Sequence, residues 1–258
     1  MSKHDAFRPD RRSVLRGGGM LAVLSAVASA ASRKTLAATP DAARSFAGEI
    51  APGVYAHHGH VAEYTPENEG DIANAGFIVG RDAVAVIDTG GSARVGAWLR
   101  AAIRSVTDLP IRYVINTHMH PDHVFGNAAF EADQPAFVGH HKLARGLSAR
   151  AERYIAINKE ALGEDVFAGT KIVLPTLAIN APTTLDLGGR TIELEPQKTA
   201  HTDNDLSVLD DTSATLFAGD LLFIDHLPVI DGRLIGWLEV MDRLGTLDVQ
   251  HMVPGHGA

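Results

Sequence analysis

Three histidines and one aspartate lie within six residues of this sequence, namely His118, His120, Asp122 and His123. Imidazole nitrogen and carboxylate oxygen are the ligands that zinc takes when no thiolate is offered. Side chains two residues apart in an extended segment point to the same side, so His118 and His120 can bind one ion. A turn at Pro121 would then direct Asp122 and His123 toward a second ion. The cluster predicts a metal centre, and the alternative is a surface loop that is merely rich in histidine.

The composition restricts how such a centre can be built. The chain has 258 residues and no cysteine, so neither a disulfide nor a thiolate ligand is available, and any zinc must be held by histidine, aspartate or glutamate. The hydrophobic content of 45% is sufficient to bury one sizeable core. The net charge of -8, without a block of like charges, argues against a nucleic-acid-binding surface.

Three further candidate ligands lie beside β-rich runs elsewhere in the chain. His201 lies in a polar turn ahead of a run at 207–209, Asp220 follows an apolar run at 214–218, and His256 lies between two glycines. A single histidine or aspartate at such a position is usually a cap or a satisfied polar group. Together with the cluster at 118–123 they supply six or seven ligands, which we expect to converge at one edge of a sheet.

Other histidines are expected to have different roles. His57, His58 and His60 precede the first strong strand signal and have no acidic residue close by, so they are predicted to be structural or to border a substrate pocket. His140 and His141 are adjacent and would point apart on a helix, which prevents them from binding one ion. We expect them to cap or border the helix that begins there.

Two residues are expected to orient ligands instead of binding metal. Asp88 ends the β-rich run 83–87, where its carboxylate could accept a hydrogen bond from a ligand histidine. A role for Asp88 as a helix cap or turn residue is an equal alternative. Thr117, next to His118, is assigned the same supporting role.

The hydrophobic pattern predicts several strands. Hairpins are predicted at 75–87 and 184–194, each divided by a turn that contains glycine. A short strand with a turn at Pro52–Gly53 is predicted at 46–55. Further single strands are predicted at 111–115, 136–139, 207–209 and 214–218. The polar stretch 65–71 is expected to be a loop that could form a flap over a pocket.

Helices are predicted between some of these strands. Val95, Trp98, Leu99 and Ile103 recur at helical spacing after a capping Ser92, which predicts a helix with one apolar face and places Trp98 in the core. A short helix is predicted at 124–130, and a long charged helix from 140 to about 162. Helices and strands mixed in this way are typical of the α/β class.

Residues 1–38 carry the features of an export signal. Arg11 and Arg12 precede an uncharged run of 16 residues from Gly17 to Ser32. This run is shorter than the roughly 20 residues needed to span a bilayer, which disfavours the alternative of a retained membrane anchor. The paired arginines predict a twin-arginine signal peptide, cleaved after Ala30 or near 37–38, with no stable membrane anchor thereafter. The mature domain would be 39–258, in the periplasm.

These motifs, in this order, resemble those of the metallo-β-lactamase-fold superfamily. The resemblance runs from Ala51 to Ala258 and includes the cluster at 118–123, His201 in an HTxxD context, Asp220 after Ala-Gly, and His256 in PGHG. It implies an αββα four-layer sandwich with a dinuclear site at one edge of two sheets.

The resemblance also implies a role for each candidate ligand. The first zinc ion would be held by His118, His120 and His201. The second would be held by Asp122, His123 and His256. Asp220 would bridge the two ions, and Asp122 would also be the catalytic residue.

The resemblance can be narrowed within the superfamily. An aspartate at 220 and the absence of cysteine differ from the β-lactamases of this fold and are closer to the glyoxalase II, lactonase and sulfur-oxidation-associated branches. The stretches 64–74 and 117–127 resemble the quinoprotein relay system zinc metallohydrolases, which implies a partner among PQQ-dependent dehydrogenases. Family members usually continue with helical sequence after PGHG, which implies either a truncated sequence or an incomplete outer helix layer after Ala258.

We therefore expect an exported dinuclear zinc hydrolase that cleaves an ester, thioester, lactone or amide-like bond of a small molecule. Bound zinc lowers the pKa of water to about 7 and so supplies a nucleophile at neutral pH. Two alternatives remain: a mononuclear iron enzyme of the sulfur-transfer or dioxygenase type, and a non-catalytic zinc-binding accessory protein. No organic cofactor is expected.

Overall fold

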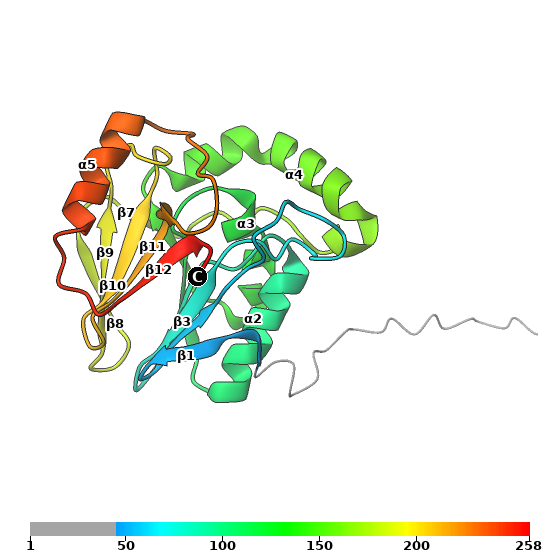
Figure 1. Cartoon of the computed structure of the whole chain (residues 1–258). Coiled ribbons are helices and arrows are strands. Elements are labelled where there is room, and N and C mark those ends of the chain that lie inside the picture. Colours follow the sequence, from blue (N-terminus) through cyan, green and yellow to red (C-terminus); the bar gives the residue numbers. More distant parts are fainter. Residues whose placement is uncertain (1–44) are drawn as a thin grey trace, which may run out of the picture. The chain divides into compact units, whose positions relative to one another are not determined.

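The computed structural model describes residues 45–258, which form two β-sheets packed face to face between helices (Figure 1). The expected signal peptide at 1–38, with Arg11, Arg12 and the candidate cleavage sites, lies outside the described residues. Among residues 45–258, no helix combines the length and the apolar character that a membrane crossing requires.

The first sheet has seven strands that lie in chain order. They are β1 (Gly48–Ala51), β2 (Val54–His57), β3 (Ala75–Val79), β4 (Val84–Ile87), β5 (Ile111–Ile115), β6 (Ala136–His140) and β7 (Leu177–Ile179). Strands β1 to β4 are antiparallel, which confirms the hairpin at 75–87, and β4 to β7 are parallel. The turn expected at Pro52–Gly53 is confirmed, with a φ of 74° at Gly53, and it divides the segment 46–55 between strands β1 and β2.

The second sheet has five strands in the order β12-β11-β10-β9-β8. They are β8 (Thr183–Asp186), β9 (Thr191–Pro196), β10 (Leu206–Asp210), β11 (Thr215–Phe223) and β12 (His251–His256). Strands β8 and β9 confirm the second hairpin, and β11 and β12 are parallel. Strand β11 is longer than the expected 214–218, so Asp220 lies within the strand and not after it. Pro254 is tolerated in β12 because this is an edge strand.

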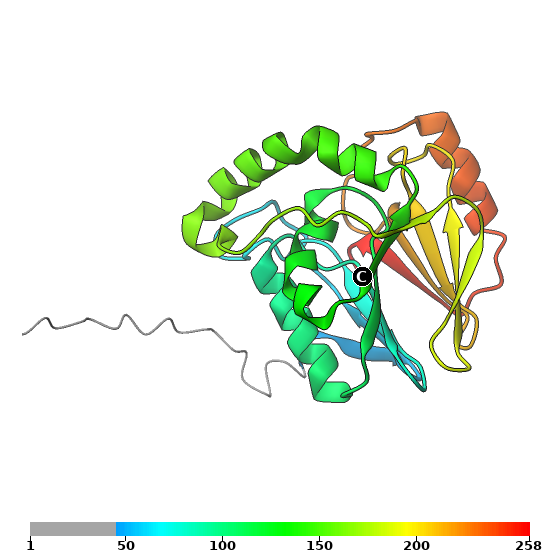
Figure 2. The ribbon, with the colours of Figure 1, turned by 180° about the vertical axis from the view of Figure 1, so that it is seen from behind.

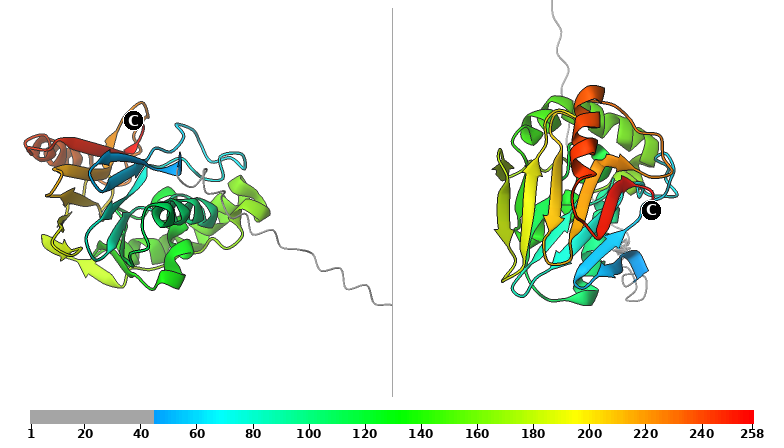
Figure 3. Two further views of the ribbon diagram at one scale, coloured as in Figure 1. Left: turned by 90° about the horizontal axis from the view of Figure 1, so that it is seen from below. Right: turned by 60° about the vertical axis from the view of Figure 1, so that its left-hand side comes forward.

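Helices cover the outer face of each sheet (Figure 3). Helix α2 (Ala93–Val106) packs on the seven-stranded sheet, and the Ser92 hydroxyl accepts a hydrogen bond from the Val95 amide at its start. Leu99 and Ile103 are buried as expected, but Trp98 is only half-buried, at the rim beside Phe46. Helix α5 (Leu234–Leu244) covers the five-stranded sheet and was not predicted from the sequence.

The segment after the histidine cluster differs from the expected short α-helix. A single turn, α3 (Pro121–Val124), passes into a 3-10 helix, η1 (Phe125–Asp133). The Gly126 amide donates to the carbonyl oxygen of Gly90, outside the helix, at 2.9 Å, which interrupts the regular α-helical hydrogen bonding.

The long helix α4 (Leu143–Phe167) covers α3 and η1 (Figure 2). It begins later than expected, because His140 ends β6 and is buried. The expectation that His140 and His141 point apart was wrong, since they lie ahead of the helix and their rings stack with centroids 4.2 Å apart. The helix axis breaks at Gly163, whose backbone is not helical.

Apolar side chains fill each interface between layers. One cluster lies between the two sheets, a second between the seven-stranded sheet and α2, and a third between the five-stranded sheet and α5. This arrangement confirms the expected αββα sandwich, and it leaves one edge of both sheets to carry the histidines.

A buried ion pair also joins the two sheets. Arg190, directly before β9, donates from Nε and Nη2 to the two carboxylate oxygens of Asp210, both at 2.8 Å. Its Nη1 donates to the carbonyl oxygens of Pro52 and Val79 on the other sheet, at 2.9 and 3.1 Å. Asp210 is fully buried and therefore depends on Arg190 for its charge partner.

Replacement of Arg190 by methionine should lower the free energy of unfolding by about 3–5 kcal/mol, because the Asp210 carboxylate is left buried without its partner. Chemical denaturation would measure this loss. Arg112→Met is the control, since Arg112 is exposed and bonds only the Asp186 carbonyl oxygen, and it should change stability by less than about 1 kcal/mol. Equal losses in both variants would contradict this account of the ion pair.

Candidate metal centre

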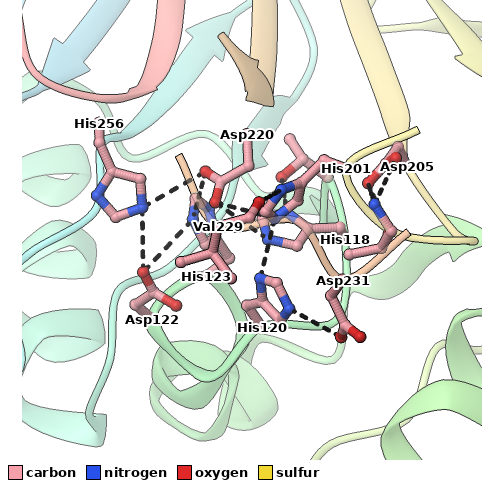
Figure 4. A network of polar contacts seen from close by, with 12 residues as sticks. His118, His120, Asp122, His123, His201, Asp205, Asp220, Val229, Asp231 and His256 are labelled. Atoms are coloured by element: carbon pink, nitrogen blue, oxygen red, sulfur yellow. Dashed lines mark hydrogen bonds and ion pairs between the residues drawn. The ribbon is translucent and has the colours of Figure 1, made fainter. Parts of the chain in front are cut away.

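The topology brings the candidate ligands to one edge of the two sheets. Strands β4 and β5 are parallel neighbours, so Asp88 at the end of one and the motif at 118–123 after the other lie side by side. His256 ends β12, and Asp220 lies in the adjacent β11. Figure 4 shows that five histidines and two aspartates from these segments point into one space.

The ligand-type atoms form two groups. One consists of His118, His120, His201 and Asp220, and the other of Asp122, His123 and His256, and within each group the atoms lie within 4.8 Å of one another. In the first, Nε2 of His201 lies 3.0 Å from Nδ1 of His120 and 3.2 Å from Oδ2 of Asp220. In the second, Nε2 of His256 lies 3.2 Å from Oδ2 of Asp122.

Asp220 lies between the two groups. Its Oδ2 faces the first group, 3.5 Å from Nε2 of His118, while its Oδ1 lies 3.0 Å from Nε2 of His123 and 3.5 Å from Nε2 of His256. One carboxylate thus presents an oxygen to each group. All seven residues that the sequence singles out as candidate ligands meet here.

Each histidine has its outward-facing nitrogen next to an acceptor. The pairs are His118 Nδ1 with Thr117 Oγ1 (3.1 Å), His120 Nε2 with Asp231 (3.3 Å), His123 Nδ1 with Asp88 (2.8 Å), His201 Nδ1 with the Val229 carbonyl oxygen (2.8 Å) and His256 Nδ1 with the Ile72 carbonyl oxygen (2.8 Å). Carbonyl and carboxylate oxygens accept hydrogen bonds, so the outward nitrogens carry the protons. The inward nitrogens are then free to offer lone pairs to a cation.

Three inward atoms fit a cation in particular. Nε2 of His118, Nε2 of His123 and Oδ1 of Asp220 are buried and make no hydrogen bond, although acceptors and donors lie near them. A buried polar atom without a partner costs about 1–3 kcal/mol, so three in one cluster require an explanation. Atoms that point at a common centre and not at each other have the arrangement of ligands. The nitrogen and oxygen donor set suits zinc.

The Asp88 carboxylate is hydrogen-bonded to residues that orient both groups. Its Oδ2 accepts from Nδ1 of His123 and from the hydroxyl of Thr117 (2.7 Å), and its Oδ1 accepts from the amide of Thr117 (2.8 Å). The Thr117 hydroxyl oxygen in turn accepts from Nδ1 of His118. Asp88 therefore orients His123 directly and His118 through Thr117.

Two glycines allow β11 to come close to the motif. Gly219 has a φ of 55°, and a Cβ there would lie 2.6 Å from the Cβ of Thr117. A Cβ on Gly255 would lie 1.9 Å from Oδ1 of Asp220. The pairing of β11 with β12 shifts register on both sides of Gly219, and such an irregularity turns a side chain away from its regular direction. Asp220 therefore reaches the space between the two groups.

Burial and charge move the pKa values of these groups in opposite directions. Burial lowers the pKa of His118 well below its usual range. Burial alone would also lower the pKa of His256, but Asp122 and Asp220 raise it to about 10. Burial acts to raise the pKa of Asp122, yet His123 and His256 hold it at about 2. Asp122 is thus a carboxylate at neutral pH, and the cluster as a whole favours positive charge between its carboxylates.

A cavity of about 250 Å³ opens onto both groups. Its walls include the candidate ligands His120, Asp122, Asp220 and His256 together with Ala62, Glu63, Ile72, Pro121, Phe223, His226 and Val229. Ala62, Glu63 and Ile72 flank or belong to the polar loop expected as a flap. Arg94 of α2 pairs with Glu69 at 3.1 Å and so ties this loop to the fold.

Several supporting residues could not be found from the sequence. Asp231 contacts His120, and Arg150 of α4 lies 3.5 Å from the Asp231 carboxylate. The acceptors for His256 and His201 are the backbone carbonyl oxygens of Ile72 and Val229, and a backbone acceptor cannot be recognised from the residue type. Asp231 lies in the segment 224–233, which has no periodic pattern, and the sequence gives no indication that this segment folds back onto the histidines.

The histidines near the start of the domain are not part of either group. His57 contacts the Phe46 carbonyl oxygen and Oδ1 of Asp71, both at 2.6 Å, and stacks on the Phe46 ring. The expectation that it lacks an acidic companion was wrong, because the loop brings Asp71 back to it. His58 Nδ1 lies 3.2 Å from the Gly257 carbonyl oxygen, and His60 is exposed.

Comparison with known proteins places these features in a family. The family model described as the metallo-beta-lactamase superfamily matches residues 68–256. A linear primary-alkylsulfatase from Pseudomonas sp. (strain ATCC 19151) is 37% identical over 49 residues, which are 19% of this chain and 9% of that protein. This chain therefore matches only a small part of the sulfatase.

Solved structures show the same fold. A metallo-beta-lactamase from Pontibacter korlensis superposes with a TM-score of 0.63 at 19% identity, over 82% of this chain and 91% of that one. The protein TMB-1 superposes with a TM-score of 0.61 at 18% identity, over 82% of this chain and 89% of its own.

Asp88→Asn should weaken zinc binding about 10–100-fold, because asparagine has one acceptor oxygen and its NH2 group would face either the Thr117 amide or the His123 ring and Thr117 hydroxyl. The positive φ of 55° at this position is tolerated by asparagine, so the backbone is not strained by the change. Competition with a chromogenic chelator would measure the affinity. Asp248→Asn, at an exposed position, is the matched control, and an equal affinity for both variants would exclude a positioning role for Asp88.

Proposed function

Since this chain belongs to the metallo-beta-lactamase superfamily, we propose that it is a hydrolase with two zinc ions held by the centre at the sheet edge. His118, His120 and His201 would hold one ion, and Asp122, His123 and His256 the other, with Asp220 as the bridge. Superfamily membership and the histidine–aspartate cluster support this assignment.

The observation that carries the proposal is the position of Asp220 between two complete groups. A mononuclear iron site would use only one group and would leave the inward nitrogens of the other without a partner. In both groups the histidines are oriented by hydrogen bonds from their outward nitrogens, so each group is prepared to bind an ion. We therefore place the dinuclear zinc assignment ahead of the iron alternative.

The side chains of the cavity can support hydrolysis of an acyl bond. Zinc in such a site acidifies water and polarises the oxygen of the bond to be cleaved. Asp122 lines the cavity as a carboxylate and can accept a proton from the attacking water at one of its oxygens. The water oxygen adds to the acyl carbon, the bond from that carbon to the leaving oxygen, sulfur or nitrogen breaks, and the leaving group takes up the proton.

The finer assignments are supported by sequence alone. We propose export by the twin-arginine route to the periplasm from the paired Arg11 and Arg12 and the uncharged run that follows them. We propose membership of the quinoprotein relay branch, with a quinoprotein partner, from the stretches 64–74 and 117–127.

Protein purified without added metal should contain about two zinc ions per chain, measured by inductively coupled plasma mass spectrometry. Asp220→Ala should reduce this number to one or none, because it removes a ligand from each group. Asp108→Ala, at an exposed position, is the control and should leave the number unchanged. Iron in place of zinc would favour the sulfur-transfer or dioxygenase alternative.

Asp122→Ala should lower turnover by about 10²–10⁴-fold, because the proton acceptor at the cavity is lost. The assay should use the zinc-loaded protein with esters, thioesters, lactones, a β-lactam and a linear alkyl sulfate. The zinc content of the variant must be measured alongside, since Asp122 is also a candidate ligand. Retained turnover in Asp122→Ala would exclude the assigned role, and a wild-type protein inactive on every substrate would favour the accessory-protein alternative.

A further inference from the structure

A second cavity lies next to the metal centre and is almost entirely apolar. We call it the α5 groove; its volume is about 290 Å³ and its walls are Leu221, Leu222, Phe223, His226, Pro228, Ile230, Leu234, Trp237, Leu238 and Met241. None of these residues is an aspartate, glutamate, lysine or arginine. The indole nitrogen of Trp237 donates to the Leu221 carbonyl oxygen at 2.9 Å, and Nδ1 of His226 lies 3.0 Å from the Leu227 carbonyl oxygen. Nε2 of His226 is therefore the side-chain polar atom that the walls offer.

The α5 groove and the metal cavity share two wall residues, Phe223 and His226. The Phe223 ring stacks on the His256 ring with centroids 5.2 Å apart and an angle of 8° between planes, and its other contacts include Trp237. The His226 ring centroid lies 5.0 Å from that of His256. Only one side chain, that of Phe223 or His226, therefore separates a molecule in the groove from His256, a candidate zinc ligand.

Exposed apolar side chains are concentrated in the segment that borders this groove, and three of them, Ile230, Leu234 and Leu238, line it. Of the ten large apolar side chains that are exposed among residues 45–258, six lie between Leu227 and Leu238. An exposed apolar patch of this kind usually marks a binding surface. The α5 groove adjoins the polar cavity, so one ligand could place an apolar part in the groove and a reactive part beside the carboxylates and imidazoles.

We propose that the substrate is an amphiphilic ester or thioester whose apolar chain lies in the α5 groove while its acyl bond lies in the metal cavity. This assignment rests on the proposed hydrolase function and names its substrate class. The volume of the groove is at the lower end of the range for ligand pockets, about 300–1,000 Å³, which favours a chain of moderate length over a bulky ring system. The absence of charge in the walls requires a chain without ionised groups.

Binding can be tested without turnover through Trp237. The chain contains two tryptophans, and Trp98→Phe leaves Trp237 as the only one. Titration of this variant with 1-octanol should give a saturable change in fluorescence, and 1-butanol should bind much more weakly, because each buried methylene contributes up to about fourfold in affinity. No difference between the two alcohols would overturn the proposal.

Substitutions on α5 offer a matched control. Leu234→Gln and Leu238→Gln, at side chains that line the groove, should each weaken 1-octanol binding by about three- to tenfold. Ile235→Gln should leave it unchanged, because Ile235 lies on the same helix and does not line the groove. The three side chains are 51%, 54% and 57% exposed, so glutamine should be tolerated equally well at each position.

Turnover by the zinc-loaded protein separates this inference from the proposed function. For p-nitrophenyl acetate, butyrate, hexanoate and octanoate, KM should fall by about two- to fourfold for each added methylene until the groove is filled. Leu234→Gln and Leu238→Gln should flatten this dependence, and Ile235→Gln should keep it. Hydrolysis with a KM independent of chain length would overturn the substrate assignment and leave the hydrolase intact.

Two other outcomes have distinct meanings. Saturable 1-octanol binding without hydrolysis of any ester would refute the hydrolase and leave the apolar site in place. Light scattering would show whether the patch instead joins two copies of the chain. A concentration-dependent dimer that is lost equally in Leu234→Gln, Leu238→Gln and Ile235→Gln would overturn the substrate assignment in favour of self-association.

Discussion

The Asp88 carboxylate is the interaction on which the geometry of the centre depends. It stands at the end of β4 and accepts hydrogen bonds from the amide and hydroxyl of Thr117 and from the ring of His123. The two oxygens of this carboxylate hold both Thr117, which precedes the motif, and His123, which ends it. These contacts fix the arrangement of the loop after β5. The positive φ of Asp88 turns its side chain toward that loop. Without these hydrogen bonds, the side chains of the four candidate ligands at 118–123 could adopt many orientations.

The centre is also a joint between the two sheets. The seven-stranded sheet supplies the motif at 118–123 through β5, and the five-stranded sheet supplies Asp220 and His256 through β11 and β12. Because the candidate ligands come from both sheets, the affinity for a bound metal would contain part of the free energy of sheet packing, as in other sites where binding and folding are linked. The Arg190–Asp210 pair joins the same sheets by ordinary hydrogen bonds, so their packing does not depend on a cation alone.

The sequence predicts those parts of the site that are local. The spacing of His118, His120, Asp122 and His123 predicts a metal site because residues close in the chain can supply several ligands to one ion, and the structure places all four in the two groups of candidate ligands. Strand–turn patterns likewise predict most of both sheets. Helix α5 does have a local signal, since Trp237, Val240, Met241 and Leu244 recur at helical spacing, and it could have been predicted. Asp231 escapes prediction because its contact with His120 joins residues 111 positions apart in the chain. His57 was misjudged for the same reason, since its acidic partner, Asp71, is supplied by the folding of a loop.

The segment 224–233 connects the two cavities physically. Its backbone accepts from His201 at Val229 and donates to the His201 carbonyl oxygen at Asp231, while the Asp231 side chain contacts His120. Pro228 and Ile230 of the same segment form walls of the α5 groove. A ligand in the α5 groove therefore packs against the direct neighbours of Val229 and Asp231, the residues that contact His201 and His120. If the proposed substrate and metal ions bind as inferred, this one short loop would couple substrate selection to the geometry of the metal centre.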